Sequence, residues 1–189
     1  MDGRRAAIAP LPWTWLRQVH GARVVVVTRP GEHAGEEADA AVTAVPGCTL
    51  SVQVADCAPI ALVADGAVGV VHAGWRGLLA GVVGNAVAAL RDLGADRIRA
   101  HVGPCIGPEC YEFGAEDLDR IAAVLGDEVR RANGADGWAL DVPAAVRSAL
   151  RSAGVDEVAE EQVCTSCSAA HWSFRGAGDS ARQAVVAWM

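Results

Sequence analysis

DCAPIALVADGAVGVVHAGWRG, residues 56–77, is the stretch of sequence that decides the fold. Two short apolar runs, residues 60–64 and 68–71, are separated by an Asp-Gly-Ala segment. Short runs rich in branched side chains predict buried strands, and the Asp-Gly pair between them predicts a hairpin turn. Because a hairpin returns the chain on itself, Cys57 at its start and His72 at its end should lie side by side.

A thiol next to an imidazole forms two-thirds of a typical transition-metal site, and a third ligand is needed. The candidate is His20, in the segment Arg17-Gln18-Val19-His20-Gly21. A histidine beside a glycine could also be an ordinary turn residue that has no functional role. Sequence patterning alone leaves both interpretations open.

Composition and charge exclude several classes of function. The chain has 189 residues, of which 52% are hydrophobic and 21% charged, as expected for one globular domain with a substantial core. The net charge is -7, and all 16 basic residues are arginine. A negative balance argues against a nucleic-acid or anionic-membrane partner. An anionic substrate would have to be held by a few local arginines.

Cysteine usage and the amino-terminal residues bear on localisation. The first residues lack the continuous apolar region of a secretion signal, and the apolar stretches are too short to span a bilayer. We therefore expect a cytoplasmic protein whose six cysteines are reduced. Metal ligand or nucleophile is then a more probable role for them than disulfide formation.

Periodicity elsewhere predicts alternating strands and helices. Residues 13–19 and 22–28 resemble a strand pair, or one strand bent at Gly21. The remaining expected strands cover residues 48–54, 97–102 and 183–188, and the expected helices cover residues 78–93, 115–132 and 143–153.

Two loops hold further chemically interesting residues. Arg76, where a strand meets a helix, could complete an anion pocket with backbone N–H groups, or could form a surface ion pair. Cys105, in a loop rich in Gly and Pro, could be a fourth ligand, a nucleophile or a packing residue. The pair Cys164 and Cys167 has no second Cys or His pair at the usual spacing, which argues against a structural zinc site.

Four segments in order resemble one family. They are Gln18-Val19-His20-Gly21, Ala55-Asp56-Cys57-Ala58-Pro59, His72-Ala73-Gly74-Trp75-Arg76-Gly77 and Gly103-Pro104-Cys105-Ile106-Gly107. Together they are similar to the laccase-domain family, also called the multicopper polyphenol oxidase or YfiH-like family and now regarded as zinc-dependent purine nucleoside phosphorylases. The carboxyl-terminal segments Cys164-Thr165, Ser173-Phe174-Arg175 and Arg182-Gln183 resemble the closing motif of that family.

The resemblance implies a fold, a metal and a reaction. The fold is a mixed α/β sandwich whose sheets are flanked by helices. The metal ligands are His20, Cys57 and His72, and two imidazoles with one thiolate suit zinc. The reactions are phosphorolysis of adenosine, inosine and methylthioadenosine and hydrolytic deamination of adenosine. Copper would be adventitious, because five histidines are too few for a multicopper laccase.

Further roles follow from the resemblance as expectations. Asp56 and Glu112 are candidates for proton transfer, although Asp56 could instead orient a ligand. The candidates for contact with the nucleoside or phosphate are Gln18, Arg76, Cys105 and Arg175. The expected partners are a purine nucleoside and phosphate, and a homodimer is the assembly considered.

The sequence also departs from the family pattern. The family's amino-terminal segment with a Ser-x-Arg-x-Gly-Gly motif is not seen ahead of Trp13, so residues 1–189 are interpreted as a single domain without it. Gly176 stands where the family has a second arginine. Because of the missing segment, a catalytically silent nucleoside-binding module is one alternative. A cysteine hydrolase or deamidase is another, because the hairpin brings Cys57 and His72 together as a possible nucleophile and base.

Overall fold

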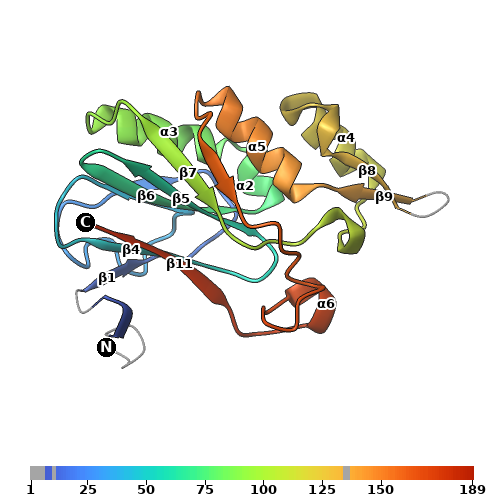
Figure 1. Cartoon of the computed structure of the whole chain (residues 1–189), viewed down its shortest axis with the longest axis horizontal. Helices are drawn as coiled ribbons and strands as arrows, with labels where there is room; N and C mark the ends of the chain where they lie inside the picture. Colours follow the sequence, from blue (N-terminus) through green and yellow to red (C-terminus); the bar gives the residue numbers. More distant parts are fainter. Residues whose placement is uncertain (1–6, 10–11, 134–136) are drawn as a thin grey trace.

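The computed structural model describes residues 7–9, 12–133 and 137–189. The chain forms three layers (Figure 1). Helices cover one face of a six-stranded sheet, and the other face of that sheet packs against a three-stranded sheet. The expected mixed α/β architecture with helices flanking the sheets is confirmed.

The six-stranded sheet carries the predicted hairpin at its centre. Its strand order is β10-β7-β5-β6-β3-β2. The strands are β2 (Val24–Val26), β3 (Ala40–Thr43), β5 (Ala58–Ala64), β6 (Ala67–Ala73), β7 (Ile98–Val102) and β10 (Val158–Glu160). In the β5–β6 register Pro59 pairs with His72, so the hairpin brings Cys57 and His72 to the same end of the sheet.

The three-stranded sheet has the order β1-β4-β11. Its strands are β1 (Trp13–Trp15), β4 (Thr49–Val54) and β11 (Gln183–Trp188). The expected pairing of residues 13–19 with residues 22–28 is wrong, because β1 pairs with β4 while β2 pairs with β3 in the other sheet. The chain crosses from one sheet to the other between these strands, and His20 and Gly21 lie in that crossing. A separate pair, β8 (Arg130–Asn133) with β9 (Gly137–Leu140), lies beside the helices.

Four helices in the described ranges are longer than one turn: α2 (Trp75–Leu79), α3 (Val82–Asp92), α4 (Ala115–Leu125) and α5 (Val142–Ser152). Of these, α2, α3 and α5 pack on the six-stranded sheet, and α4 packs against α2 and α5. The shorter elements are the 3₁₀ turns η1 (Pro108–Cys110) and η2 (Asp127–Val129) and the single turn α6 (Phe174–Ala177).

Glycines with positive φ shorten two of the expected helices. The expected helix over residues 78–93 is broken at Gly81, whose φ is 86°. The expected helix over residues 115–132 ends at Gly126, whose φ is 93°, and η2 and β8 follow. A left-handed residue cannot continue a right-handed helix, so glycine stops both. The third helix is confirmed, and Asp141 caps it by accepting from the Ala144 N–H at 2.8 Å.

Buried apolar side chains fill both spaces between layers. One cluster, including Ile60, Leu62 and Leu90, lies between the six-stranded sheet and the helices. The other, including Leu50, Val52 and Val70, lies between the two sheets. This packing fixes the strand ends at which His72 and its neighbours lie.

In the part of the chain described, no helix combines the length and apolar character needed to cross a bilayer.

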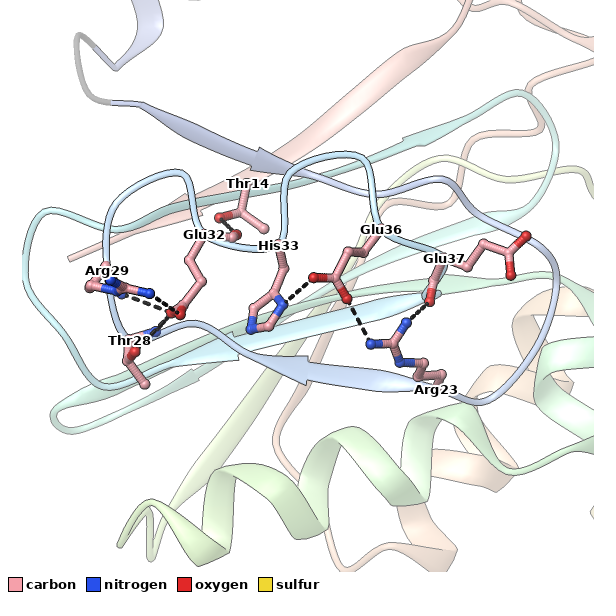
Figure 2. Close-up of polar contacts among 8 residues, drawn as sticks. All are labelled: Thr14, Arg23, Thr28, Arg29, Glu32, His33, Glu36 and Glu37. Atoms are coloured by element: carbon pink, nitrogen blue, oxygen red, sulfur yellow. Dashed lines mark hydrogen bonds and ion pairs between the residues drawn. The ribbon is translucent and has the colours of Figure 1, made fainter.

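The loop between β2 and β3 is held by its own polar side chains (Figure 2). The Glu32 carboxylate accepts from the Thr28 N–H and hydroxyl, each at 2.8 Å, and pairs with Arg29 at 3.0 Å. The Glu36 carboxylate contacts both His33 and Arg23, each at 2.7 Å. These contacts order the loop that delivers Asp39 to the start of β3, beneath the His20 turn.

Candidate metal centre and substrate pocket

The three expected ligands converge at one end of the six-stranded sheet. Cys57 immediately precedes β5, His72 is the penultimate residue of β6, and His20 lies in the turn before β2. One donor atom from each residue lies within 4.8 Å of the other two, and His20 Nε2 is 3.8 Å from Cys57 Sγ. His72 is buried, whereas His20 is exposed. The cluster is therefore buried at His72 and reaches solvent at His20.

Asp39 joins two of the three residues. Its fully buried carboxylate lies 2.8 Å from His72 Nδ1. The same carboxylate accepts from the backbone N–H groups of Val19, His20 and Gly21 at 3.2, 2.9 and 2.8 Å. These bonds hold His20 in its left-handed conformation, with φ at 58°. Since His72 Nδ1 donates to Asp39, the other ring nitrogen, Nε2, is the one left to face Cys57 and His20.

The ionisation of these side chains is strongly coupled to their surroundings. Burial opposes the charge on His72, but hydrogen bonds to Asp39 and Cys57 prevail and raise the pKa of His72 to about 9. Burial likewise opposes the Cys57 thiolate, yet the His20 and His72 imidazoles lower the pKa of Cys57 to about 7. The His72 hydrogen bond helps keep the pKa of Asp39 below its usual value despite desolvation. The site thus favours a thiolate near neutral pH.

Two glycines allow the segments of the site to approach closely. A Cβ on Gly74 would lie 2.7 Å from His20 Cδ2 and 3.1 Å from Cys57 Sγ. A Cβ on Gly77 would lie 3.0 Å from the Gly21 carbonyl oxygen. Any side chain at Gly74 would therefore crowd the His20 ring and the Cys57 sulfur.

The cluster lies at a pocket of about 630 Å³, a volume typical of small-molecule sites. Aromatic side chains of Trp75, Tyr111 and Phe174 line it. Arg76, Arg175 and Arg182 line it as well, and they give it a local positive charge in a chain whose net charge is -7. Arg76 lies over the Trp75 ring at 4.2 Å, and Arg175 lies over the Tyr111 ring at 5.0 Å.

Asp56 holds three segments of the pocket together. Its carboxylate accepts from the Thr165 hydroxyl and from the Arg175 backbone N–H, both at 2.7 Å, and its carbonyl accepts from the Ile106 N–H at 2.9 Å. Its φ of 87° places it in the left-handed region. With both carboxylate oxygens bonded to protein, Asp56 suits a positioning role better than a proton-transfer role.

The other expected site residues divide into two groups. Arg76 and Arg175 lie in the pocket lining, as does Gln18, whose amide group makes two hydrogen bonds to the backbone of Gln53. Glu112 and Cys105 are outside that lining. Glu112 is exposed on the strand-like segment that pairs with Ala139, and Cys105 is only 4% exposed within the core.

Burial explains why Cys105 is unsuited to the expected substrate contact. Burial raises the pKa of the Cys105 thiol to about 12, so the thiol stays protonated. Such a buried, uncharged thiol serves as a packing residue. Glu112 follows Tyr111 in an extended segment, where neighbouring side chains point in opposite directions. Since Tyr111 lines the pocket, Glu112 faces away from it.

Sequence reasoning missed several pocket residues. Asp39 is the most important, and the available signal was a charged residue between alanines in an otherwise apolar segment. Tyr111, Phe174 and Arg182 were not identified as pocket residues, because segments far apart in the chain bring them together. Only the tertiary fold reveals that these three residues line the same pocket.

The fold and site define a class of protein: an α/β sandwich with a candidate metal-binding trio of two histidines and one cysteine at the sheet end. A family model described as multi-copper polyphenol oxidoreductase laccase matches residues 3–189. The chain belongs to this family, which includes the YfiH-like proteins.

Relatives in the family carry a functional name. A purine nucleoside phosphorylase of Streptomyces coelicolor is 41% identical over 198 residues, which cover 100% of this chain and 80% of the relative. A purine nucleoside phosphorylase of Xylella fastidiosa is 38% identical over 190 residues, covering 93% and 71% of the two chains.

Solved structures agree with the fold. YlmD of Geobacillus stearothermophilus superposes with a TM-score of 0.84 at 31% identity, covering 97% of this chain and 76% of YlmD. A Neisseria meningitidis protein superposes with a TM-score of 0.89 at 27% identity, covering 99% and 78%.

Proposed function

We propose that this protein is a zinc-dependent enzyme that cleaves purine nucleosides by phosphorolysis. The observation that carries the proposal is the meeting of His20, Cys57 and His72 at a pocket lined by aromatic rings and arginines. The names of the relatives support the same reaction. Adenosine, inosine and methylthioadenosine are the proposed substrates, together with phosphate.

The donor set fits zinc. One thiolate and two imidazoles are ligands that zinc prefers, and three protein ligands leave one coordination position for a substrate or water. The bond between Asp39 and His72 Nδ1 is the carboxylate–histidine arrangement typical of metal-binding histidines. Zinc, when bound, would supply Lewis acidity at the end of the pocket where the nucleoside is held.

The chain's own residues would bind and orient the two substrates. Trp75, Tyr111 and Phe174 offer apolar ring surface for a purine. Arg76, Arg175 and Arg182 offer guanidinium groups for phosphate, which they would hold against the ribose C1′. Phosphorolysis breaks the bond between C1′ and the purine nitrogen and forms a bond between C1′ and a phosphate oxygen. The purine leaves with the electron pair of the broken bond and takes up a proton.

Hydrolytic deamination of adenosine is the second reaction proposed for this pocket. In it water replaces the amino group at C6, and ammonia leaves. Since Asp56 is fully bonded, we propose that it acts by holding Thr165 and Arg175 beside the pocket. It would therefore support either reaction by positioning.

Product analysis tests the proposal. Protein loaded with zinc is incubated with adenosine, with and without phosphate, and the purine products are separated. Release of adenine that requires phosphate supports phosphorolysis, and inosine formed without phosphate supports deamination. Neither product from adenosine, inosine or methylthioadenosine, in a protein that has retained zinc, would overturn the proposed activity.

One observation favours a second candidate, a cysteine hydrolase or deamidase. The pKa of Cys57 is lowered to about 7, and its sulfur lies 3.8 Å from a histidine nitrogen, as in a nucleophile paired with a base. Zinc at the site would exclude this chemistry, because a metal-bound thiolate is not a free nucleophile. Rapid alkylation of Cys57 in the presence of saturating zinc would favour the cysteine enzyme.

A further inference from the structure

A second cluster of metal-ligand residues lies outside the site described above. Cys110 ends η1, and Cys164 and Cys167 lie in the turn that follows β10. Together with Glu109 they place four donor atoms within 4.8 Å of one another. The spacing argument against a site at Cys164 and Cys167 was incomplete, since the missing partners come from a loop more than fifty residues earlier in the sequence.

The backbone around this cluster is arranged for thiolates. Cys164 Sγ accepts from the Gly107 N–H at 3.2 Å, and the Cys167 N–H also points at this sulfur. Backbone N–H groups directed at a sulfur stabilise its negative charge. Gly107 also leaves room for the fourth residue, because a Cβ there would collide with the Glu109 carboxylate.

The distances suit a shared ion better than a disulfide. Cys110 Sγ is 3.3 Å from Cys167 Sγ, and Cys167 Sγ is 3.8 Å from Glu109 Oε1. A tetrahedral ion with Zn–S bonds of about 2.3 Å separates its sulfur ligands by about 3.8 Å, while a disulfide needs about 2.05 Å. A disulfide would join two of the thiols and would not account for the third thiol and the carboxylate beside them.

We propose that Cys110, Cys164, Cys167 and Glu109 bind a second zinc ion with a structural role. Four protein ligands fill a tetrahedral ion and leave no position for substrate, as in structural zinc sites. Zinc fits the donors, because three soft thiolates with one carboxylate disfavour magnesium or calcium.

The second ion would fix one wall of the substrate pocket. Tyr111 follows Cys110 directly and lines the pocket. Thr165 follows Cys164 directly, and its hydroxyl donates to Asp56 next to Cys57. The two loops also meet through a backbone bond from the Thr165 N–H to the Cys105 carbonyl at 3.1 Å. An ion held by both loops would keep Tyr111 and Asp56 in register with each other.

Metal content of matched variants tests the proposal. The protein is reduced, loaded with zinc, freed of excess ion by gel filtration and analysed for zinc per chain. Wild-type protein and Cys48→Ala should hold about two ions, and Cys167→Ser and Cys110→Ser about one each. Cys48 is a buried core thiol far from both clusters and so controls for the loss of a cysteine. Cys57→Ala should lose the ion at His20, Cys57 and His72 and keep the second ion. Cys167→Ser should lose the second ion and keep the first.

Two further readouts keep the result independent of variant folding and of the proposed activity. Cobalt(II) titration of the wild type should give a sulfur-to-cobalt charge-transfer band from four thiolates. The band should keep most of its intensity in Cys57→Ala and fall about fourfold in the double variant Cys110→Ser Cys167→Ser, in which only the Cys57 thiolate still binds an ion. Thiol counting of the unreduced, denatured chain should find all six cysteines free. A zinc content that does not change in Cys167→Ser, or only four free thiols, would overturn the proposal. An ion lost from Cys167→Ser but retained in Cys57→Ala supports it whatever the nucleoside assay gives.

Discussion

The carboxylate of Asp39 lies 2.8 Å from Nδ1 of His72, and both side chains are buried. The same carboxylate holds the backbone of the His20 turn through three N–H groups. One side chain therefore fixes two of the three candidate ligands, and it connects them to the loop shown in Figure 2.

Asp39→Asn should weaken zinc binding while the fold persists. The carboxylate accepts hydrogen bonds from His72 and from three backbone N–H groups, and an amide NH₂ in its place would face these donors without accepting from them. His72 would then lose the partner that orients its ring. We expect zinc affinity to fall by about 10–100-fold, as for other partners of metal-binding histidines. Competition with a chromogenic chelator measures it.

The matched control is Asp65→Asn, in the exposed turn of the β5–β6 hairpin. It should leave zinc affinity unchanged. Equal affinity of Asp39→Asn and wild type would show that Asp39 does not support a metal ligand.

Gly74→Ala should disturb the site by steric conflict. The added methyl group would lie 2.7 Å from His20 Cδ2, so the His20 ring must move away from Cys57. Zinc affinity should fall about 10-fold or more, by the same loss of ligand geometry. Isothermal titration of the metal-free variant measures the change.

Gly84→Ala is the comparison for Gly74→Ala. Gly84 lies in α3, and apart from its own helix backbone no atom lies within 4 Å of where a Cβ at this residue would be. Alanine there should leave zinc binding intact and stabilise the helix by up to about 1 kcal/mol. Normal zinc binding by Gly74→Ala would contradict the close approach of these segments.

The reactivity of Cys57 should depend on pH in a characteristic way. Because the folded pKa of this thiol is lowered to about 7, the thiolate fraction should rise as pH increases through 7 and then level off. The alkylation rate of metal-free protein, followed by mass spectrometry of the Cys57 peptide, should trace that curve.

Two internal comparisons belong to the same experiment. Cys105, whose pKa is raised to about 12, should stay unmodified across the range. Zinc should protect Cys57. A Cys57 rate that keeps rising well above neutral pH would mean that the imidazoles do not stabilise its thiolate.

Glu32 should contribute to stability against acid. Its hydrogen bonds from the Thr28 N–H and hydroxyl, and from Arg29, lower its pKa from 4.5 to about 2. A group with a lowered folded pKa stabilises the fold fully above the unfolded pKa, and this contribution disappears as pH falls through the folded value. The stabilisation by Glu32 should therefore be lost as the pH falls from about 4.5 to about 2.

Urea unfolding of wild type and Glu32→Gln measures this contribution. The difference in unfolding free energy between them should be constant above the window and shrink within it. A difference that does not depend on pH would show that the Glu32 contacts do not persist in solution.

The sequence was sufficient for the features that local patterns encode. The apolar runs and the Asp-Gly turn predicted the β5–β6 hairpin, and the hairpin register brings Cys57 and His72 together as expected. The strand over residues 183–188 and the helix over residues 143–153 were also predicted, because alternation and helical periodicity are local signals.

Features that depend on long-range contacts could not be predicted in the same way. Gly81 and Gly126 were not recognised as helix breaks, since a glycine within an apolar periodic pattern is compatible with a continuous helix. The partition of β1 and β2 into different sheets depends on their partners, because β1 pairs with β4 and β2 pairs with β3. The role of Asp39 depends on contacts from two distant segments, and so does the meeting of Cys110 with Cys167.

The most direct test of the central claim is anomalous X-ray scattering at the zinc absorption edge from crystals grown with zinc. The account predicts a peak among His20 Nε2, Cys57 Sγ and His72 Nε2, with His72 Nδ1 still bonded to Asp39. Crystals that show zinc elsewhere on the chain but none among these three atoms would contradict it.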